Sequence, residues 1–246
     1  MTNKLIYYAV ALLATSAFAA DTTPKDDVKA AAKQLSEKPN YSWKSTTENA
    51  GGGGGGGGGG RGGGRGRGPS EGKIEKDGYT HLVYPGRDDA KTDVFSKGEK
   101  GAIKTQDGWK SLTEAGAEEG PGAFMARAVK NFKAPAAQAA ELADKVKELK
   151  KVDDAYKGDL TEEGAKSLLT FGGRGGGNGP EVSGAKGSAT FWVKDGVLSK
   201  YAYKVQGTVS FNGNDREVDR TTTIEIKDVG TTKVEVPEEA SKKASS

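Results

Sequence analysis

The sequence contains no cysteine, one histidine and two methionines among its 246 residues. The absence of cysteine excludes disulfide bonds, thiolate metal ligands, cysteine nucleophiles and an acylated cysteine that would tether the chain to a membrane. A single histidine excludes a two-histidine metal site, and His81 lies in the strand-like stretch YTHLVYP with no nucleophile predictable beside it. Adjacent carboxylates such as Asp88-Asp89 fit solvated turns better than a pair held across a cleft. We therefore predict no catalytic residue, no metal, no cofactor and no enzymatic activity.

A strong excess of one charge is also missing. The chain carries 37 basic and 34 acidic residues. Without Lys4, which belongs to the N-terminal segment discussed next, 36 basic and 34 acidic residues remain, a net charge of +2. Nucleic-acid-binding domains have a marked basic excess, so this balance argues against a nucleic-acid partner.

Long apolar runs are absent except at the N-terminus. MTNKLIYYAVALLATSAFA combines Lys4, an apolar stretch and small residues at the two positions before a cleavage site after Ala19. This pattern predicts a signal peptide over residues 1–19. The apolar run is shorter than the roughly 20 residues that a membrane-spanning helix needs. We expect the mature chain, residues 20–246, to be an exported monomer without a membrane span, in the periplasm or outside the cell.

Glycine, in contrast, is abundant, with 38 residues, many of them in one tract. We predict that residues 49–70, which contain GGGGGGGGGGRGGGRGRG, form a disordered loop between two strands, because glycine loses much conformational entropy when it is ordered. Arg61, Arg65 and Arg67 are its distinctive charges and could attract an anionic component of the cell envelope. Aromatic residues for stacking on bases are absent, and a strand rather than a helix follows, which argues against RNA and nucleotide binding. A second glycine-rich loop is expected at residues 172–180.

The rest of the chain has the periodicities of a mixed fold. PKDDVKAAAKQLSEKPN predicts a helix, YSWKSTTE a strand, and GKIEKDGYTHLVYPG a hairpin that turns at Asp77-Gly78. Three helical segments are expected between residues 121 and 171. Period-two alternation is clearest over residues 197–211, which should pair with KGSATFWV across Asp195-Gly196. Two final strands are expected, with Ile224, Ile226, Val234 and Val236 pointing inward. A polar tail is expected after them.

Hairpin-linked strands with one apolar face need a cover, and the helices are the candidates. We therefore predict an α+β fold in which residues 20–246 form a single domain. Its core element would be one curved antiparallel sheet, an unclosed half-barrel, with helices covering the concave face.

This order of elements resembles the Lol-type lipoprotein carriers of the bacterial periplasm and the related mycobacterial lipoprotein lipid carriers. The resemblance rests on the first helix followed by YSWKST, the meander from GKIEKDGYTHLVYPG to GWKSL, and the helical insertion. It continues through GSATFWVKDGVLSKYAYKV and the closing TTTIEIKDVGTTKVEVPEEA, and so covers nearly all of the mature chain outside the glycine tract. It implies a non-enzymatic carrier whose apolar interior holds a lipid or acyl ligand.

Six inward-facing residues of the late strands are candidates for lining such an interior: Phe191, Val193, Tyr201, Tyr203, Val205 and Val209. The same residues are also compatible with an ordinary core packed against Met125, Val129, Leu142 and Val146. Two functions therefore remain open. One is binding of an apolar or amphipathic ligand between sheet and helices. The other is a structural or interaction role in the envelope, with a filled core and surface loops that contact a protein or a polysaccharide.

Overall fold

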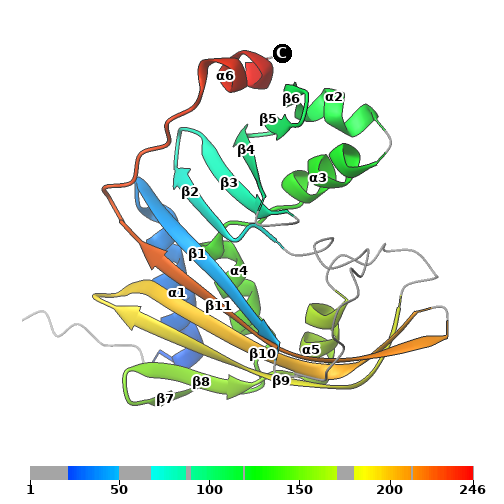
Figure 1. The fold of residues 1–246 in the computed structure, drawn as a ribbon. Helices are drawn as coiled ribbons and strands as arrows, with labels where there is room; N and C mark the ends of the chain where they lie inside the picture. Colours follow the sequence, from blue (N-terminus) through cyan, green and yellow to red (C-terminus); the bar gives the residue numbers. More distant parts are fainter. Residues whose placement is uncertain are drawn as a thin grey trace, which may run out of the picture.

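The computed structural model describes six segments of the chain: residues 22–49, 68–86, 90–118, 120–170, 180–211 and 213–245. They form one antiparallel sheet of eleven strands and six helices (Figure 1). The strand order is β6-β5-β4-β3-β2-β1-β11-β10-β9-β8-β7, with two edges, β6 and β7, that do not pair with each other. The α+β class and the unclosed, curved half-barrel predicted from the sequence are confirmed.

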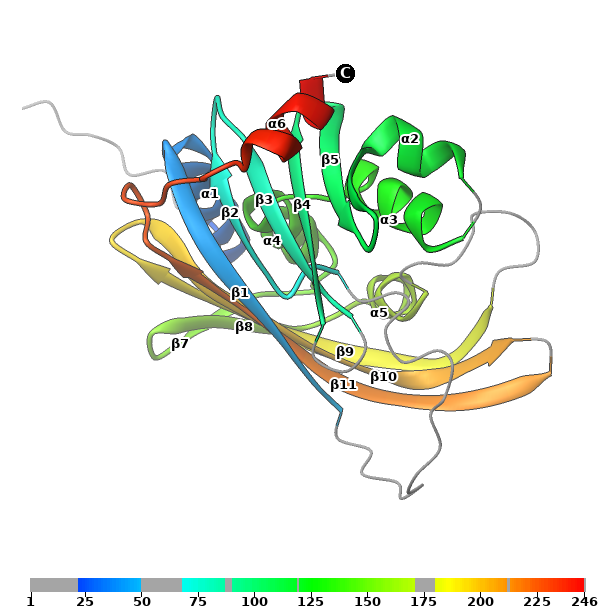
Figure 2. The same ribbon diagram turned by 45° about the horizontal axis from the view of Figure 1, so that its top comes forward.

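From β1 near the centre of the sheet, strands β2 to β6 follow in chain order towards one edge. On the other side of β1, strands β11 to β7 follow in reverse chain order towards the other edge. Their bounds are β1 Asn40–Asn49, β2 Glu71–Glu75, β3 Thr80–Pro85, β4 Lys91–Lys97, β5 Lys100–Thr105, β6 Gly108–Ser111, β7 Lys150–Val152, β8 Ala155–Asp159, β9 Glu181–Lys194, β10 Val197–Phe211 and β11 Asn214–Lys227. The long strands β9, β10 and β11 continue past the ends of their neighbours and curve (Figure 2).

Five of the helices belong to the side of the sheet that holds the main core. The helix bounds are α1 Pro24–Glu37, α2 Leu112–Ala117, α3 Pro121–Lys130, α4 Pro135–Asp144, α5 Glu162–Leu169 and α6 Glu238–Ser245. The concave side carries α1, α4 and α5, with α1 against α4 and α5 on β9 and β10 (Figures 1 and 2). No helix in the described part of the chain has the length and apolar character to cross a bilayer.

The first helix illustrates how local sequence sets a packing face. Thr23 caps α1 in a reciprocal capping box with Asp26, which satisfies backbone N–H groups that the first turn leaves free. Four residues at helical spacing are then buried against the sheet and α4: Val28, Ala31, Ala32 and Leu35. Burying a side chain the size of Leu35 contributes about 1.5–3 kcal/mol, so this stripe is a main attachment of α1.

The hairpin of β9 and β10 sets the register of the centre of the sheet. Its turn, Asp195-Gly196, has positive φ at both residues (51° and 74°), the conformation of the tight turn that matches strand twist. A one-residue shift in register between Leu198 and Lys200 follows the turn, and beyond it Tyr201 lies opposite Phe191 on β9 and opposite Ile224 on β11. These three side chains face inward and are buried, as the alternation predicted.

Two glycines on the inward face allow α5 to approach the sheet closely. A Cβ at Gly207 of β10 would lie 2.8 Å from Leu169 Cδ1. A Cβ at Gly187 of β9 would lie 2.8 Å from Leu160 Cδ1 and would also meet the Lys204 carbonyl oxygen. Leu160 precedes α5 and Leu169 is its last residue, so the missing side chains at the two glycines leave room for both ends of the helix.

The C-terminal segment differs from the prediction. Val234 and Val236 do not lie in an inward-facing strand, because residues 231–237 form no strand and the Val234 N–H donates to Glu75 Oε1 at 2.9 Å. The expected polar tail instead contains α6, whose Ala240 and Ala244 are buried. Their spacing of four residues places both on one face of the helix, so a small apolar pair was enough to dock it.

This helix covers the opposite face of the sheet from the main core. Ala240 and Ala244 pack with Phe95 of β4 and Ala102 of β5, with Tyr79, Trp109, Val234 and Val236 around them. The adjacent residues Val94 and Ile103 belong to the main core. Since neighbouring residues in a strand point to opposite faces, α6 packs on the convex side.

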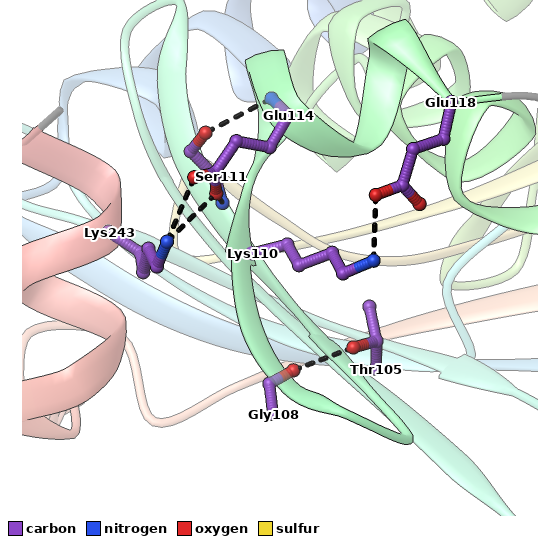
Figure 3. Close-up of polar contacts among 7 residues, drawn as sticks. All are labelled: Thr105, Gly108, Lys110, Ser111, Glu114, Glu118 and Lys243. Atoms are coloured by element: carbon purple, nitrogen blue, oxygen red, sulfur yellow. Dashed lines mark hydrogen bonds and ion pairs between the residues drawn. The ribbon is translucent and has the colours of Figure 1, made fainter.

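An ion pair fastens α6 to α2 (Figure 3). Lys243 Nζ lies 2.9 Å from Glu114 Oε1 and 3.1 Å from Oε2. Glu114 also accepts a hydrogen bond from the backbone N–H of Ser111 at 2.7 Å. Lys243 and then the Ser111 N–H lower the pKa of Glu114 from its ordinary 4.5 to about 2.

We predict that Gly187→Ala lowers the free energy of unfolding by about 1–3 kcal/mol, because the added methyl group must displace Leu160 or the β10 backbone. Urea denaturation measures the change. Ser188→Ala, the next residue on the other face of β9, is the matched control and should shift the free energy by less than about 0.5 kcal/mol. Equal small effects of both substitutions would contradict the close approach at Gly187.

We also predict that the ion pair between α6 and α2 stops stabilising α6 at acid pH. A carboxylate whose pKa is lowered by folding contributes its stabilisation above the unfolded pKa of 4.5 and loses it as the pH falls towards 2. The ratio of amide exchange rates over residues 238–245, Glu114→Gln over wild type, should exceed one at pH 5–7 and approach one near pH 2. Comparing both proteins at the same pH cancels the intrinsic exchange rate.

The control for this experiment is Glu118→Gln. Glu118 directly follows α2 and pairs with Lys110 at 2.7 Å, without a contact to α6 (Figure 3). Its substitution should leave the α6 exchange ratio at one throughout. An exchange ratio of one for Glu114→Gln at pH 7 would show that the ion pair does not hold the helix.

Candidate ligand site on the concave face

The six residues predicted to line an interior fall into two groups. Phe191, Tyr201 and Val205 are fully buried, with exposed fractions of 0%, 1% and 0%. The other three are half-buried and pack against the same core: Val193, Tyr203 and Val209. The structure therefore brings all six to the main core, but only the second group keeps surface that another molecule can contact.

The fully buried group forms a filled region under α1 and α4. The Tyr201 hydroxyl donates to Gln138 Oε1 of α4 at 3.0 Å, and its ring stacks on Phe191 with centroids 6.4 Å apart. Burial raises the pKa of Tyr201 well above 10, so the phenol is neutral. Phe191, Tyr201 and Val205, which the sequence analysis named as candidate lining residues, are therefore packed by other side chains of the protein.

In the half-buried group, Val193 lies opposite Leu198 near the Asp195-Gly196 turn, Tyr203 lies further along the inward face, and Val209 lies at the end where the long strands continue beyond α5. Along this end of the inward face, Val209 is opposite Val182 on β9, and Gly207 is opposite Val218 on β11. We call the surface formed by Val182, Tyr203, Val209, Val218 and Arg220 the distal concave surface. All five are half-buried, and four of them are apolar or aromatic.

Arg220 is the charged member of this surface. It is opposite Val205 of β10 and Asn49 of β1. Its Nη2 donates to the Leu168 carbonyl oxygen near the C-terminal end of α5 at 2.6 Å, where a cation is favoured by the helix dipole. Its Nε is buried and has no hydrogen-bond partner.

Two hydroxyls lie next to Arg220 on the same face. Thr222 is buried, and its Oγ1 is 3.4 Å from Thr47 Oγ1 of β1. Tyr203 is opposite Thr222 in the register. Along this face the residues therefore run from hydroxyls through the Arg220 guanidinium to valines, and the exposed Arg216 lies opposite Val209 at the far end.

An open depression of about 510 Å³ lies elsewhere. Seven residues line it: Glu37, Pro39, Asn40, Glu75, Lys76, Asp77 and Gly78. It shares no residue with the predicted lining. We do not assign the apolar ligand to it.

The remaining sequence candidates are His81 and the three arginines of the glycine tract. His81 stacks on Phe95 with ring centroids 4.4 Å apart, and its Nε2 is 2.7 Å from Asp93 Oδ1, so the ring is part of the β3–β4 packing. Arg61, Arg65 and Arg67 fall outside the described residues, as do most of the two glycine-rich loops; their contact with an anionic component stays a prediction. The tract's flanking strands, β1 and β2, are antiparallel neighbours.

Sequence reasoning missed Arg220 and Thr222 although a signal was present. Ile224 and Ile226 were predicted to point inward, and the same alternation, followed back two residues at a time, places Thr222 and Arg220 on that face. Continued further back, the alternation also places Arg216 on this face, opposite Val209, where it is exposed.

Comparisons with known proteins locate the chain only at the level of fold. No family model and no curated protein matches it. Among solved structures it is similar to LprF from Mycobacterium bovis, with 11% identity over 88% of this chain and 97% of that one and a TM-score of 0.45. It is also similar to the lipoprotein LppX of Mycobacterium tuberculosis, with 11% identity, coverage of 87% and 98%, and a TM-score of 0.43. These matches agree with the fold-level resemblance predicted from the sequence, and they assign neither a ligand nor an activity to this chain.

Proposed function

We propose that this chain is an exported, non-enzymatic protein that binds an apolar or amphipathic ligand of the lipid class on its distal concave surface. The observation that carries the proposal is the row of half-buried inward residues beyond α5, above all Val182, Val209 and Val218. They continue the apolar face of the core past the helices that cover it. Tyr203 and Val209 would contact the ligand, and Phe191, Tyr201 and Val205 would form the rigid packing beneath it.

Simple magnitudes favour a long-chain ligand over a small apolar molecule. Each buried methylene contributes about 0.8 kcal/mol, whereas association costs about 4–15 kcal/mol in lost freedom of motion. A chain of about five methylenes would barely offset the low end of that cost, and a chain of about fifteen would exceed most of it. An acyl chain is therefore the natural partner of an open apolar strip of this kind.

The second candidate function is an interaction protein of the envelope with a filled core. The complete burial of Phe191, Tyr201 and Val205 favours it, because the region under α1 and α4 then serves only stability. In that case a protein or a polysaccharide, rather than a lipid, would contact the protein. An anionic partner of the arginine-glycine tract, and a monomeric state, are part of neither argument and stay expectations.

Native mass spectrometry of the purified protein tests the ligand. We expect co-purifying lipid, or uptake of an added fluorescent fatty acid by a stripped sample. Val209→Asn should weaken uptake about 10-fold or more, because an unpaired amide in the apolar strip must be desolvated by the bound chain. The melting temperature should change little, since Val209 keeps part of its surface exposed.

The matched control is Thr208→Asn, the neighbouring residue on the convex face of the same strand, which should leave uptake unchanged. A clean mass of the bare chain together with no uptake would reject the lipid proposal and leave the interaction protein. Equal weakening by both substitutions would place the ligand elsewhere on the molecule.

A further inference from the structure

Arg220 has hydrogen-bonding capacity that the fold does not use. A guanidinium has five N–H donors and no acceptor. The Leu168 carbonyl takes one of these donors, and Nε is buried without a partner. Buried donors are normally paired, so an unused one on the candidate binding surface points to a missing acceptor.

The charge of Arg220 is also uncompensated. Within the described segments, no carboxylate forms an ion pair with it. Its chain neighbour Asp219 points to the convex face, where Gln206 Nε2 donates to it at 2.6 Å and Lys204 Nζ lies 3.2 Å away. Gln206, and after it Lys204, lower the pKa of Asp219. This carboxylate therefore pairs with groups on the other side of the sheet, although its Oδ1, like Arg220 Nε, is buried without a hydrogen-bond partner.

We infer that the ligand's polar end is an oxyanion, a carboxylate or a phosphate, and that Arg220 binds it. This inference rests on the proposed function and names the class of ligand: an anionic amphiphile. The guanidinium fork matches the two oxygens of either group, and such charge-assisted bonds are stronger than neutral ones. Because Arg220 is half-buried as a whole, an oxyanion can reach the exposed part of its side chain, whereas Nε itself is buried.

The neighbours of Arg220 fit the two ends of such a molecule. Val218, two residues back on the same face of β11, begins the apolar strip that Val182 and Val209 continue. Thr222, two residues forward, offers a hydroxyl beside Thr47. An amphiphile with its oxyanion at Arg220 would therefore have its apolar tail along the valines and its other polar atoms near the hydroxyls.

A purely structural role is the competing explanation, since Arg220 also fastens the end of α5. The test therefore compares oleate with methyl oleate, which has the same tail and an uncharged head group. Dodecyl phosphate serves as a phosphate with an apolar tail of its own, and inorganic phosphate as a head without a tail. Affinities of the full mature chain are measured by displacement of N-phenyl-1-naphthylamine, an uncharged fluorescent probe. Wild-type protein should bind oleate about 10-fold or more tightly than methyl oleate.

Arg220→Met should bring this ratio close to one while binding of methyl oleate stays within about twofold. Arg220→Lys, which keeps the charge without the fork, should retain part of the ratio. The control is Lys227→Met, which removes one positive charge from the far end of the same strand and should keep the wild-type ratio. Dodecyl phosphate should behave like oleate, and inorganic phosphate alone should not compete.

Four results would overturn the inference. Equal binding of oleate and methyl oleate by wild-type protein would leave the proposed lipid function standing and remove the anion site. Equal weakening of both probes by Arg220→Met would show that Arg220 acts only through α5. Competition by inorganic phosphate as strong as that by dodecyl phosphate would identify a phosphate site unrelated to lipid. Failure of every probe to bind would reject the proposed function and this inference together.

Discussion

The rest of the structure depends on the register of three long strands. Tyr201 of β10 lies between Phe191 of β9 and Ile224 of β11, and all three side chains point into the core. Because strand side chains alternate with period two, a slip of one residue would expose Tyr201 and bury Lys200. The observed register begins after a one-residue shift between Leu198 and Lys200, close to the tight turn at Asp195-Gly196. Both the position of the helices and the inward orientation of Arg220 follow from this one register.

Local signals explain which parts of the fold could be predicted from the sequence. The cap of α1 at Thr23, the turn at Asp195-Gly196 and the alternation along β10 each act within a few residues. The structure confirms the cap and the turn, and it confirms the alternation from Tyr201 to Val209, whereas Leu198, before the register shift, is buried against the predicted pattern. The docking of α6 could not be predicted in this way, because Ala240 and Ala244 are too small to mark an apolar stripe without Phe95 opposite them. The contact of α5 with Gly187 likewise depends on residues that meet only in three dimensions. At the candidate site, the inward face was predictable, and the division between buried and half-buried lining was not, because it depends on where helices end.

Lengths explain why that division exists. The fifteen residues of β10 span about 50 Å at about 3.3 Å per residue. The fourteen residues of α1 span about 21 Å, and the eight of α5 about 12 Å, at 1.5 Å per residue. Helices of these lengths cannot cover the inward face of the strand from end to end. The face is therefore a filled core around Tyr201 and an apolar strip around Val209, although the pattern of residues is the same in both.

Arg220 lies at the boundary between the two regions, which gives it a part in both. It holds the end of α5 through the Leu168 carbonyl, and its buried Nε has no hydrogen-bond partner. Since a guanidinium has five donors, an oxyanion need not displace that carbonyl. A bound anion would instead hold the side chain in place, and with it the last turn of α5. The free energy by which the Arg220–Leu168 contact strengthens anion binding would equal the free energy by which the bound anion strengthens that contact, because the coupling between two sites is reciprocal.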